Sequence, residues 1–237
     1  MSVARESERD NAGESGYVGY EMWVRDLETR VSGIVGASGC FYAIRVDLHA
    51  RPVPPHLSRD FAASLTAREN GYRAVSVRES VCYVPRTASL RREYRRKIRT
   101  MTRGMQTLWY KRALLHPWRH GLFAWALFSH KVCRWLVPPT ALLSIGTLAA
   151  LAAAHAWAAW ALAAAALGAV PAAVAWLWPQ GRPLPKMLAF PAYFVLGNVA
   201  ALVAWLNALR GRGQATWEPT RRSEADEPAR TSSAHAR

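Results

Sequence analysis

Asp60 is the first residue to weigh as a reactive group, because acidic side chains are few between residues 18 and 110 and this one follows a proline-rich loop. Two roles are open to it. As a first-turn residue of a helix, its carboxylate would complement the helix dipole. At the lip of a cleft, the same carboxylate would act as a general base on an attacking hydroxyl group. Position alone does not separate the two.

A strongly basic segment, SLRREYRRKIRTMTRGMQTLWY, predicts a helix from about residue 89 to residue 110. Arg96 and Arg99 would share one face of this helix at i, i+3 spacing, an arrangement suited to clamping diphosphate oxygens with paired donors. A solvated face, or one attracted to anionic lipid, is the alternative. The glycine-rich stretch from Gly33 to Gly39 lacks the G-x-G-x-x-G and GK[ST] patterns of phosphate loops.

The elements that would position these residues alternate between strands and helices. Ser32 to Val46 reads as a loop that feeds a strand, Ser58 can cap a helix over about residues 59–70, and residues 72–77 read as another strand. This alternation predicts an α/β fold class for residues 18–110. The segment is too short for a complete doubly wound sheet, and a polar leader over residues 1–17, expected to be disordered, precedes it.

The second half of the chain has the composition of a membrane protein. The 237 residues are 51% hydrophobic and carry a net charge of +15, yet residues 137–178 and 187–209 contain no Asp, Glu, Lys or Arg. Since about 20 apolar residues cross a bilayer, the first run predicts two spans that meet near His155, and the second run predicts a third. This segregation disfavours a soluble enzyme, and spans directly after the basic segment make nucleic acid an unlikely partner.

The remaining boundaries follow from the same pattern. Residues 111–136 mix aromatic and basic side chains and predict interfacial helices, residues 137–209 form the transmembrane region, and residues 210–237 form a basic, disordered tail. Lys131 and Arg134 at the start of the first span place the first half of the chain on the cytoplasmic side of the cell membrane. Three spans then leave the basic tail outside, so the side of the tail stays open.

The order of motifs carries more information than any single one. The series is VSGIVGASGCFYAIRVDL, LSRDFAASLTARENGYRAVSV, SLRREYRRKIRTMTRGMQTL and FSHKVCRWLVPP, followed by apolar spans and a closing TWEPTRR. This series, over roughly residues 18–222, resembles the C-terminal half of membrane-embedded family 2 glycosyltransferases, the group of cellulose, chitin and hyaluronan synthases. The resemblance implies a partial GT-A-like catalytic domain followed by an interfacial helix and two or three transmembrane helices.

Site residues are carried over from this resemblance by position. Asp60 matches the catalytic base of the family, which would deprotonate the acceptor hydroxyl. Arg99 would bind the donor diphosphate or help form the acceptor channel. The other matches are Gly39, Ala43 and Arg45 of a G-x-x-x-A-x-R segment, Arg96 at the Gln of a Q-x-x-R-W motif, and the S-H-K-x-x-R-W stretch Ser129, His130, Lys131, Arg134 and Trp135.

The chain also departs from the family pattern. Arg59 replaces the first acid of the usual acidic pair, and Arg96 and Thr100 replace the Gln and Trp associated with processive synthesis. No segment resembles the sugar-nucleotide half of the family. The divalent metal expected for these enzymes, Mg²⁺ or Mn²⁺, therefore has no ligands in this chain, and a separate chain could supply the donor site.

The resemblance implies a hexosyltransferase that moves a sugar from a nucleotide donor to a glycan or lipid-linked acceptor at the membrane, with membrane lipid as a further partner. One alternative is a catalytically silent scaffold or partner subunit of a complete polysaccharide synthase. Another is a basic lipid-surface protein whose motif matches arise by chance; its membrane binding would depend on anionic lipid and on salt.

Overall fold

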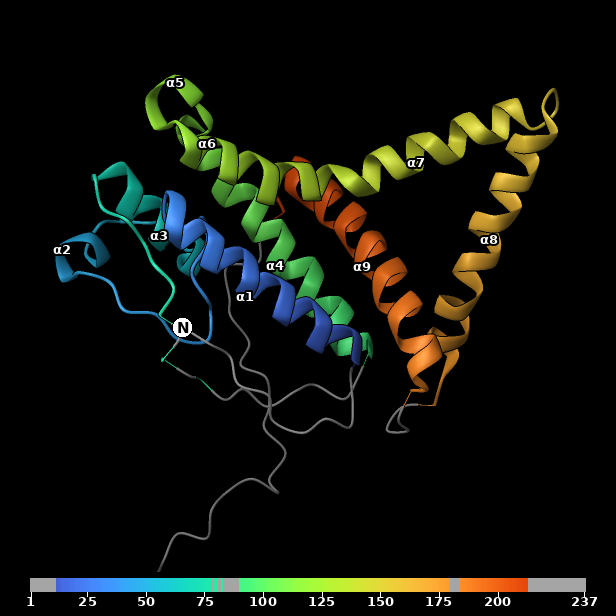
Figure 1. Cartoon of the computed structure of the whole chain (residues 1–237), viewed down its shortest axis with the longest axis horizontal. Coiled ribbons are helices and arrows are strands. Elements are labelled where there is room, and N and C mark those ends of the chain that lie inside the picture. Colours follow the sequence, from blue (N-terminus) through green and yellow to red (C-terminus); the bar gives the residue numbers. More distant parts are fainter. Residues whose placement is uncertain (1–11, 78, 81, 83–89, 180–183, 213–237) are drawn as a thin grey trace, which may run out of the picture.

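The computed structural model describes residues 12–77, 79, 80, 82, 90–179 and 184–212. Within these ranges the chain consists of helices joined by turns and irregular segments, and it contains no strand (Figure 1). The α/β fold class predicted from the sequence, with its GT-A-like domain, is therefore wrong for this part of the chain. Residues 1–11 of the predicted leader and 213–237 of the predicted tail lie outside the described ranges.

The two segments predicted as strands lack the partners that a sheet requires. Residues 72–77 are irregular, and the Ile34 amide donates a hydrogen bond to the Ala74 carbonyl at 2.8 Å. Two residues further on, the Ser76 amide donates a hydrogen bond to a side chain, Thr29 Oγ1, at 3.0 Å. A ladder repeats such backbone pairs along two strands. The other predicted strand, at the end of the segment 32–46, is irregular as well and leads into the short helix α2 (Val46–His49).

The helices before the membrane region form the scaffold of the candidate site. Helix α1 (Ala12–Val31) begins inside the predicted leader. Helices α3 (Arg59–Glu69) and α4 (Leu90–Tyr110) confirm the two helices predicted from the sequence. Their apolar faces meet the segment after α4 in one core, whose buried members are Val35, Phe61, Leu65, Leu108, Leu114, Phe123 and Leu127.

Short helical segments lead from α4 into the membrane region. They are η1 (Arg112–Leu115), α5 (Pro117–His120), α6 (Leu122–Leu127) and η2 (Phe128–Cys133), and the last of these is a π-helix. The segment 111–136, for which the sequence predicted interfacial helices, thus consists of several short helical pieces and the start of α7. Pro117 starts α5, and Gly121, at a φ of +54°, separates α5 from α6. A positive φ is a conformation that glycine adopts without steric cost.

Three helical runs are long and apolar enough to cross a membrane, as the sequence predicted. They are Leu122–Leu151, Ala156–Leu177 and Met187–Leu209. The first ends in helix α7 (Arg134–Leu151), and the other two correspond to α8 (Ala156–Leu177) and α9 (Lys186–Leu209). In Figure 1 the helices α7, α8 and α9 form the sides of a triangle, and α7 meets α8 at the turn predicted near His155.

Helix α9 joins the membrane region to the basic helix, because it packs along both α4 and α8. The Lys97 ammonium of α4 lies 3.3 Å from the centre of the Tyr193 ring, in a cation–π contact. Trp205 Nε1 of α9 also donates a hydrogen bond to the Trp135 carbonyl at 2.7 Å. The predicted basic helix is therefore attached to the third candidate span along one side.

Helix α1 is held by a cluster of ionisable groups, the acid cluster, formed by Glu21, Glu28, His130 and Arg134. Glu28 Oε1 lies 2.7 Å from His130 Nδ1, and Glu28 Oε2 accepts a hydrogen bond from the Val35 amide at 3.1 Å. Glu21 contacts the other ring nitrogen of His130 and pairs with Arg134. Two residues of the S-H-K-x-x-R-W stretch therefore face carboxylates of α1.

The acid cluster gives the fold a specific pH dependence. Burial by itself would raise the pKa of Glu21, but the His130 hydrogen bond and the charges of Lys131 and Arg134 outweigh burial and hold that pKa well below its ordinary value of 4.5. A carboxyl whose pKa is lower in the folded chain stabilises the fold above its unfolded pKa, and this contribution is lost as the pH falls.

We therefore expect thermal stability in detergent to fall more steeply below about pH 4.5 in the wild type than in the Glu21→Gln variant. Unfolding midpoints measured at steps from pH 7 to pH 3 test this expectation. The two profiles should diverge at neutral pH, where only the wild type has the ionised carboxylate, and should approach one another in acid. A constant difference at every pH would contradict the assignment.

Candidate functional site

The predicted base, Asp60, lies in the first turn of α3, where both of its sequence-based roles place it. Its Oδ1 atom accepts a hydrogen bond from the Ser58 hydroxyl at 2.5 Å. Ser58 precedes the helix, so this bond fixes the carboxylate relative to the loop that enters α3. The side chain is partly exposed.

The glycine-containing segment lies over the other oxygen of this carboxylate. A Cβ atom built on Gly39 would lie 2.8 Å from Asp60 Oδ2, closer than a carbon and an oxygen approach without displacement. In the part of the chain that the structure describes, no group donates a hydrogen bond to Oδ2. The structure thus brings Gly39 and Asp60 together and leaves one carboxylate oxygen with an unused acceptor position.

Helix α4 supports the loop that carries Asp60. Arg103 donates hydrogen bonds to the carbonyls of Pro55, at 3.1 Å, and Leu57. Thr107 Oγ1 accepts a hydrogen bond from the Ser58 amide at 2.9 Å and donates one to the Arg103 carbonyl at 2.7 Å. The position of Asp60 therefore depends on α4 as well as on its own helix.

The Asp60 carboxylate lies near enough to Arg103 for their charges to interact. Burial is the largest influence on the pKa of Arg103 and lowers it; the Asp60 carboxylate opposes this shift, and the charges of Arg99 and Arg59 add to it. Arginine stays protonated at neutral pH despite such a shift. The Asp60 carboxylate and the guanidinium groups of Arg59 and Arg99 thus all lie within electrostatic reach of Arg103, and this local excess of positive charge would attract an anionic ligand.

The remaining predicted site residues are distributed unevenly. Arg99 lies near enough to Arg103 for its charge to act there. Arg96 donates two hydrogen bonds to Glu93, three residues earlier, at 2.7 and 2.8 Å. Arg45 pairs with the exposed Asp47 at 3.1 Å, and its guanidinium lies 5.0 Å from the ring centre of Tyr72. Arg96 and Arg45 are thus held by neighbours outside the Asp60 site.

Lys131 reaches the glycine-containing loop from the side of η2. A Cβ atom on Gly36 would lie 3.5 Å from the Lys131 Cε atom and 3.7 Å from its Nζ atom. The ammonium also lies 5.9 Å from the ring centre of Phe61, which follows Asp60. The S-H-K-x-x-R-W stretch therefore contacts the same loop that covers the carboxylate.

A divalent metal does not fit this arrangement. Metal sites for Mg²⁺ or Mn²⁺ are built from several carboxylate or carbonyl oxygens, whereas the charged groups that act on Arg103 together with Asp60 are the guanidinium groups of Arg59 and Arg99. Among the described residues, no group of three or more His, Cys, Asp or Glu side chains could hold a metal ion. We therefore derive no chemical step of this site through a metal.

The fold and the site together define a class. Among its described residues the chain is helical, with three helices able to span a membrane, consistent with a multi-pass membrane protein, and the Asp60 carboxylate lies on α3 before these helices. Comparison of the chain with known protein families, curated proteins and solved structures finds no match.

The close approach of Gly39 to Asp60 leads to a test of the site geometry. We expect Gly39→Ala to lower any activity of the Asp60 site by about tenfold or more, because the added methyl group displaces either the loop or the carboxylate. Gly19→Ala is the matched control, since a Cβ on Gly19 meets nothing within 4 Å. Equal activity of the two variants at matched amounts in membranes would contradict the close approach.

Proposed function

We propose that this chain takes part in the transfer of a sugar from a nucleotide donor to a hydroxyl group of a glycan or lipid-linked acceptor at the cell membrane. One observation supports the proposal above the others: Asp60 Oδ2 faces the Gly39 loop without a hydrogen-bond donor in the described part of the chain. The order of the motifs around this carboxylate supports it independently. The proposal does not depend on a sheet, since helices and loops build the site.

The chemistry assigned to the site is a single displacement. The acceptor oxygen attacks the anomeric carbon of the donor sugar, and the bond from that carbon to the diphosphate oxygen breaks. The diphosphate leaves with the bonding electron pair, while the acceptor proton passes to Asp60 Oδ2. Arg99 would face the growing negative charge on the leaving group, where fixed positive charge is most effective.

The donor side of the reaction lies outside the residues that the structure describes. A second chain would bind the nucleotide and would hold the metal expected from the family resemblance. The predicted substrate-binding roles of Gly39, Arg45 and Arg96 remain predictions; Gly39 has the geometric support described above. We place the Asp60 site on the cytoplasmic face because the basic residues gather before the first span.

Membranes from cells that make this chain provide the test, because they contain any partner that it needs. Deleting its gene should abolish incorporation of one labelled sugar from a panel of nucleotide donors, and restoring the gene should recover it. If incorporation of every sugar were unchanged after deletion, the proposal would be wrong.

A second candidate is a catalytically silent scaffold of a complete synthase. The hydrogen bonds of Arg103 to the Pro55 and Leu57 carbonyls favour it, because they give this arginine a structural role at the site. In that case Asp60 would only complement the dipole of α3. The same deletion would impair synthesis, but a chain with a neutral residue at position 60 would restore it.

A further inference from the structure

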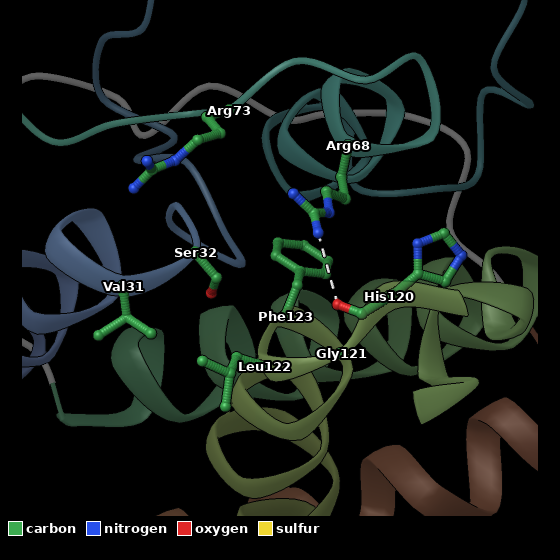
Figure 2. A pocket seen from close by; sticks show the side chains of 8 residues that line it. All are labelled: Val31, Ser32, Arg68, Arg73, His120, Gly121, Leu122 and Phe123. Atoms are coloured by element: carbon green, nitrogen blue, oxygen red, sulfur yellow. Dashed lines mark hydrogen bonds between the residues drawn. The ribbon is translucent and has the colours of Figure 1, made fainter. Parts of the chain in front are cut away.

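A hollow lies at the other end of α3 from Asp60. It has a volume of about 390 Å³, and its lining includes Ser32, Arg68, Arg73, His120, Leu122 and Phe123 (Figure 2). These residues come from the turn after α1, the end of α3, the irregular segment after α3, and the junction of α5 with α6. The proposed sugar-transfer chemistry uses none of them.

Two arginines supply the charge of this hollow. Arg68 donates one hydrogen bond to the His120 carbonyl at 3.4 Å, drawn as the dashed line in Figure 2, and its guanidinium lies 5.1 Å from the centre of the Phe123 ring. Arg73 donates to the Thr29 carbonyl at 2.7 Å. The other N–H donors of both guanidinium groups have no partner among the described residues, so they are available to an anion.

Among the described residues, no acidic side chain lines the hollow to neutralise these charges. Glu69, whose charge also acts on His120, pairs with Lys111 at 2.5 Å. Burial lowers the pKa of His120, and the charges of Arg68 and Arg119 lower it further. The imidazole is therefore neutral at neutral pH and can donate one N–H hydrogen bond.

Ser32 gives an independent indication of a ligand. This residue is only 8% exposed, and its hydroxyl oxygen is buried without a hydrogen-bond partner in the part of the chain that the structure describes. A buried hydroxyl without a partner costs free energy, so such groups are found mostly where water or a ligand completes them. Since Ser32 lines the hollow, an acceptor atom placed there would satisfy it.

The hollow also adjoins the first helical run that is long and apolar enough to cross a membrane. Leu122, one of its lining residues, is the first residue of the first candidate span. Trp118 and Trp125, on either side of it in sequence, are 91% and 67% exposed. Exposed tryptophans beside an apolar helix are typical of the headgroup layer of a bilayer. These exposed tryptophans would bring the hollow near the membrane surface.

From the two arginines, the buried Ser32 hydroxyl and the adjoining span, we propose that this hollow binds a phosphate group, with Arg68 and Arg73 as its cationic ligands and Ser32 as a hydrogen-bond donor. The phosphate comes either from the headgroup of an anionic membrane lipid or from a soluble phosphate. The site is separate from Asp60, so its test stands whether or not the chain transfers sugar.

Binding can be measured with the purified chain in neutral detergent, from the rise of its unfolding midpoint with added ligand. One arm adds phosphatidylglycerol, with phosphatidylcholine as reference, and the other adds inorganic phosphate, with chloride at equal ionic strength as reference. Two variants alter the hollow: the double variant Arg68→Gln with Arg73→Gln, and the single variant Ser32→Ala. The control is the double variant Arg92→Gln with Arg95→Gln, which removes the same charge from the exposed face of α4. All three are compared with the wild type.

We expect a ligand-specific rise in at least one arm, and the arm that responds identifies the source of the phosphate. The double variant should bind about a hundredfold more weakly, and Ser32→Ala about tenfold more weakly. The control should bind as the wild type does. No specific rise in either arm, or equal losses in the double variant and the control, would overturn the proposal. If the double variant does not fold, unchanged binding by Ser32→Ala would also overturn it.

Discussion

Replacing Asp60 by Asn is expected to reduce sugar transfer by a factor of about 10² to 10⁴, the usual contribution of a positioned general base. The amide cannot take the acceptor proton at the Oδ2 position. Its oxygen can still accept the Ser58 hydrogen bond that holds Oδ1 in the wild type. The variant should therefore fold and insert into membranes normally, and the loss should appear in the rate constant of transfer.

Asp47→Asn is the matched control for this variant. Asp47 is also an aspartate before the membrane region, but it is exposed and pairs with Arg45 on the surface. The control should keep the wild-type rate, measured as initial incorporation of labelled sugar at equal amounts of chain. An Asp60→Asn chain with the wild-type rate would remove Asp60 from the chemistry.

The largest effect on stability is expected from Glu28→Ala. Glu28 is 7% exposed, and its two oxygens contact His130 Nδ1 and the Val35 amide. Removing the carboxylate leaves both of these groups buried without a partner, which costs about 3 kcal/mol. For a chain of this size, such a loss lowers the unfolding midpoint by roughly 10 °C.

Two comparisons separate this effect from a general loss of charge. Glu28→Gln keeps an oxygen that can accept from Val35 and should lie between the wild type and Glu28→Ala. Asp47→Ala removes an exposed carboxylate and should change the midpoint little, since exposed ion pairs contribute little to stability. Equal midpoints for Glu28→Ala and Asp47→Ala in the same detergent would contradict the role of the acid cluster.

The helices were predictable where periodicity was strong or apolar runs were long. The capping position of Ser58, the basic helix up to Tyr110, the turn near His155 and the three candidate spans all have local signals. The two predicted strands are absent from the described residues, because a strand needs a neighbour that local sequence does not supply. Residues 72–77 are irregular instead; the Ala74 carbonyl accepts a backbone hydrogen bond from Ile34, and the Val77 carbonyl accepts one from the nearby Ser80 amide.

The candidate site was predictable only in part. Asp60 was singled out by its position, but its approach to Gly39 depends on how the loop folds over α3. Arg103 was missed as a site residue, although it lies one helical turn after Arg99 on α4 and shares its face. The partner of Arg96 could have been read from the sequence, because Glu93 lies three residues earlier on the same helix.

The sequence contains a spacing that indicates part of the acid cluster, and our prediction did not use it. Glu21 and Glu28 are separated by seven residues, so they lie on the same face of a helix two turns apart. Their partners, His130 and Arg134, are far away in the sequence, and only the tertiary fold brings them to α1. The helical character of α1 was missed as well, which hid this spacing.

Restoration of sugar incorporation in cells that lack this chain tests the central claim most directly. Membranes from such cells, complemented with either the wild-type chain or the Asp60→Asn chain at equal amounts, would receive the same labelled donor. A catalytic Asp60 predicts that the wild type restores incorporation and that the variant leaves it at the level of the deletion. Full restoration by the variant would contradict this and would favour the silent scaffold.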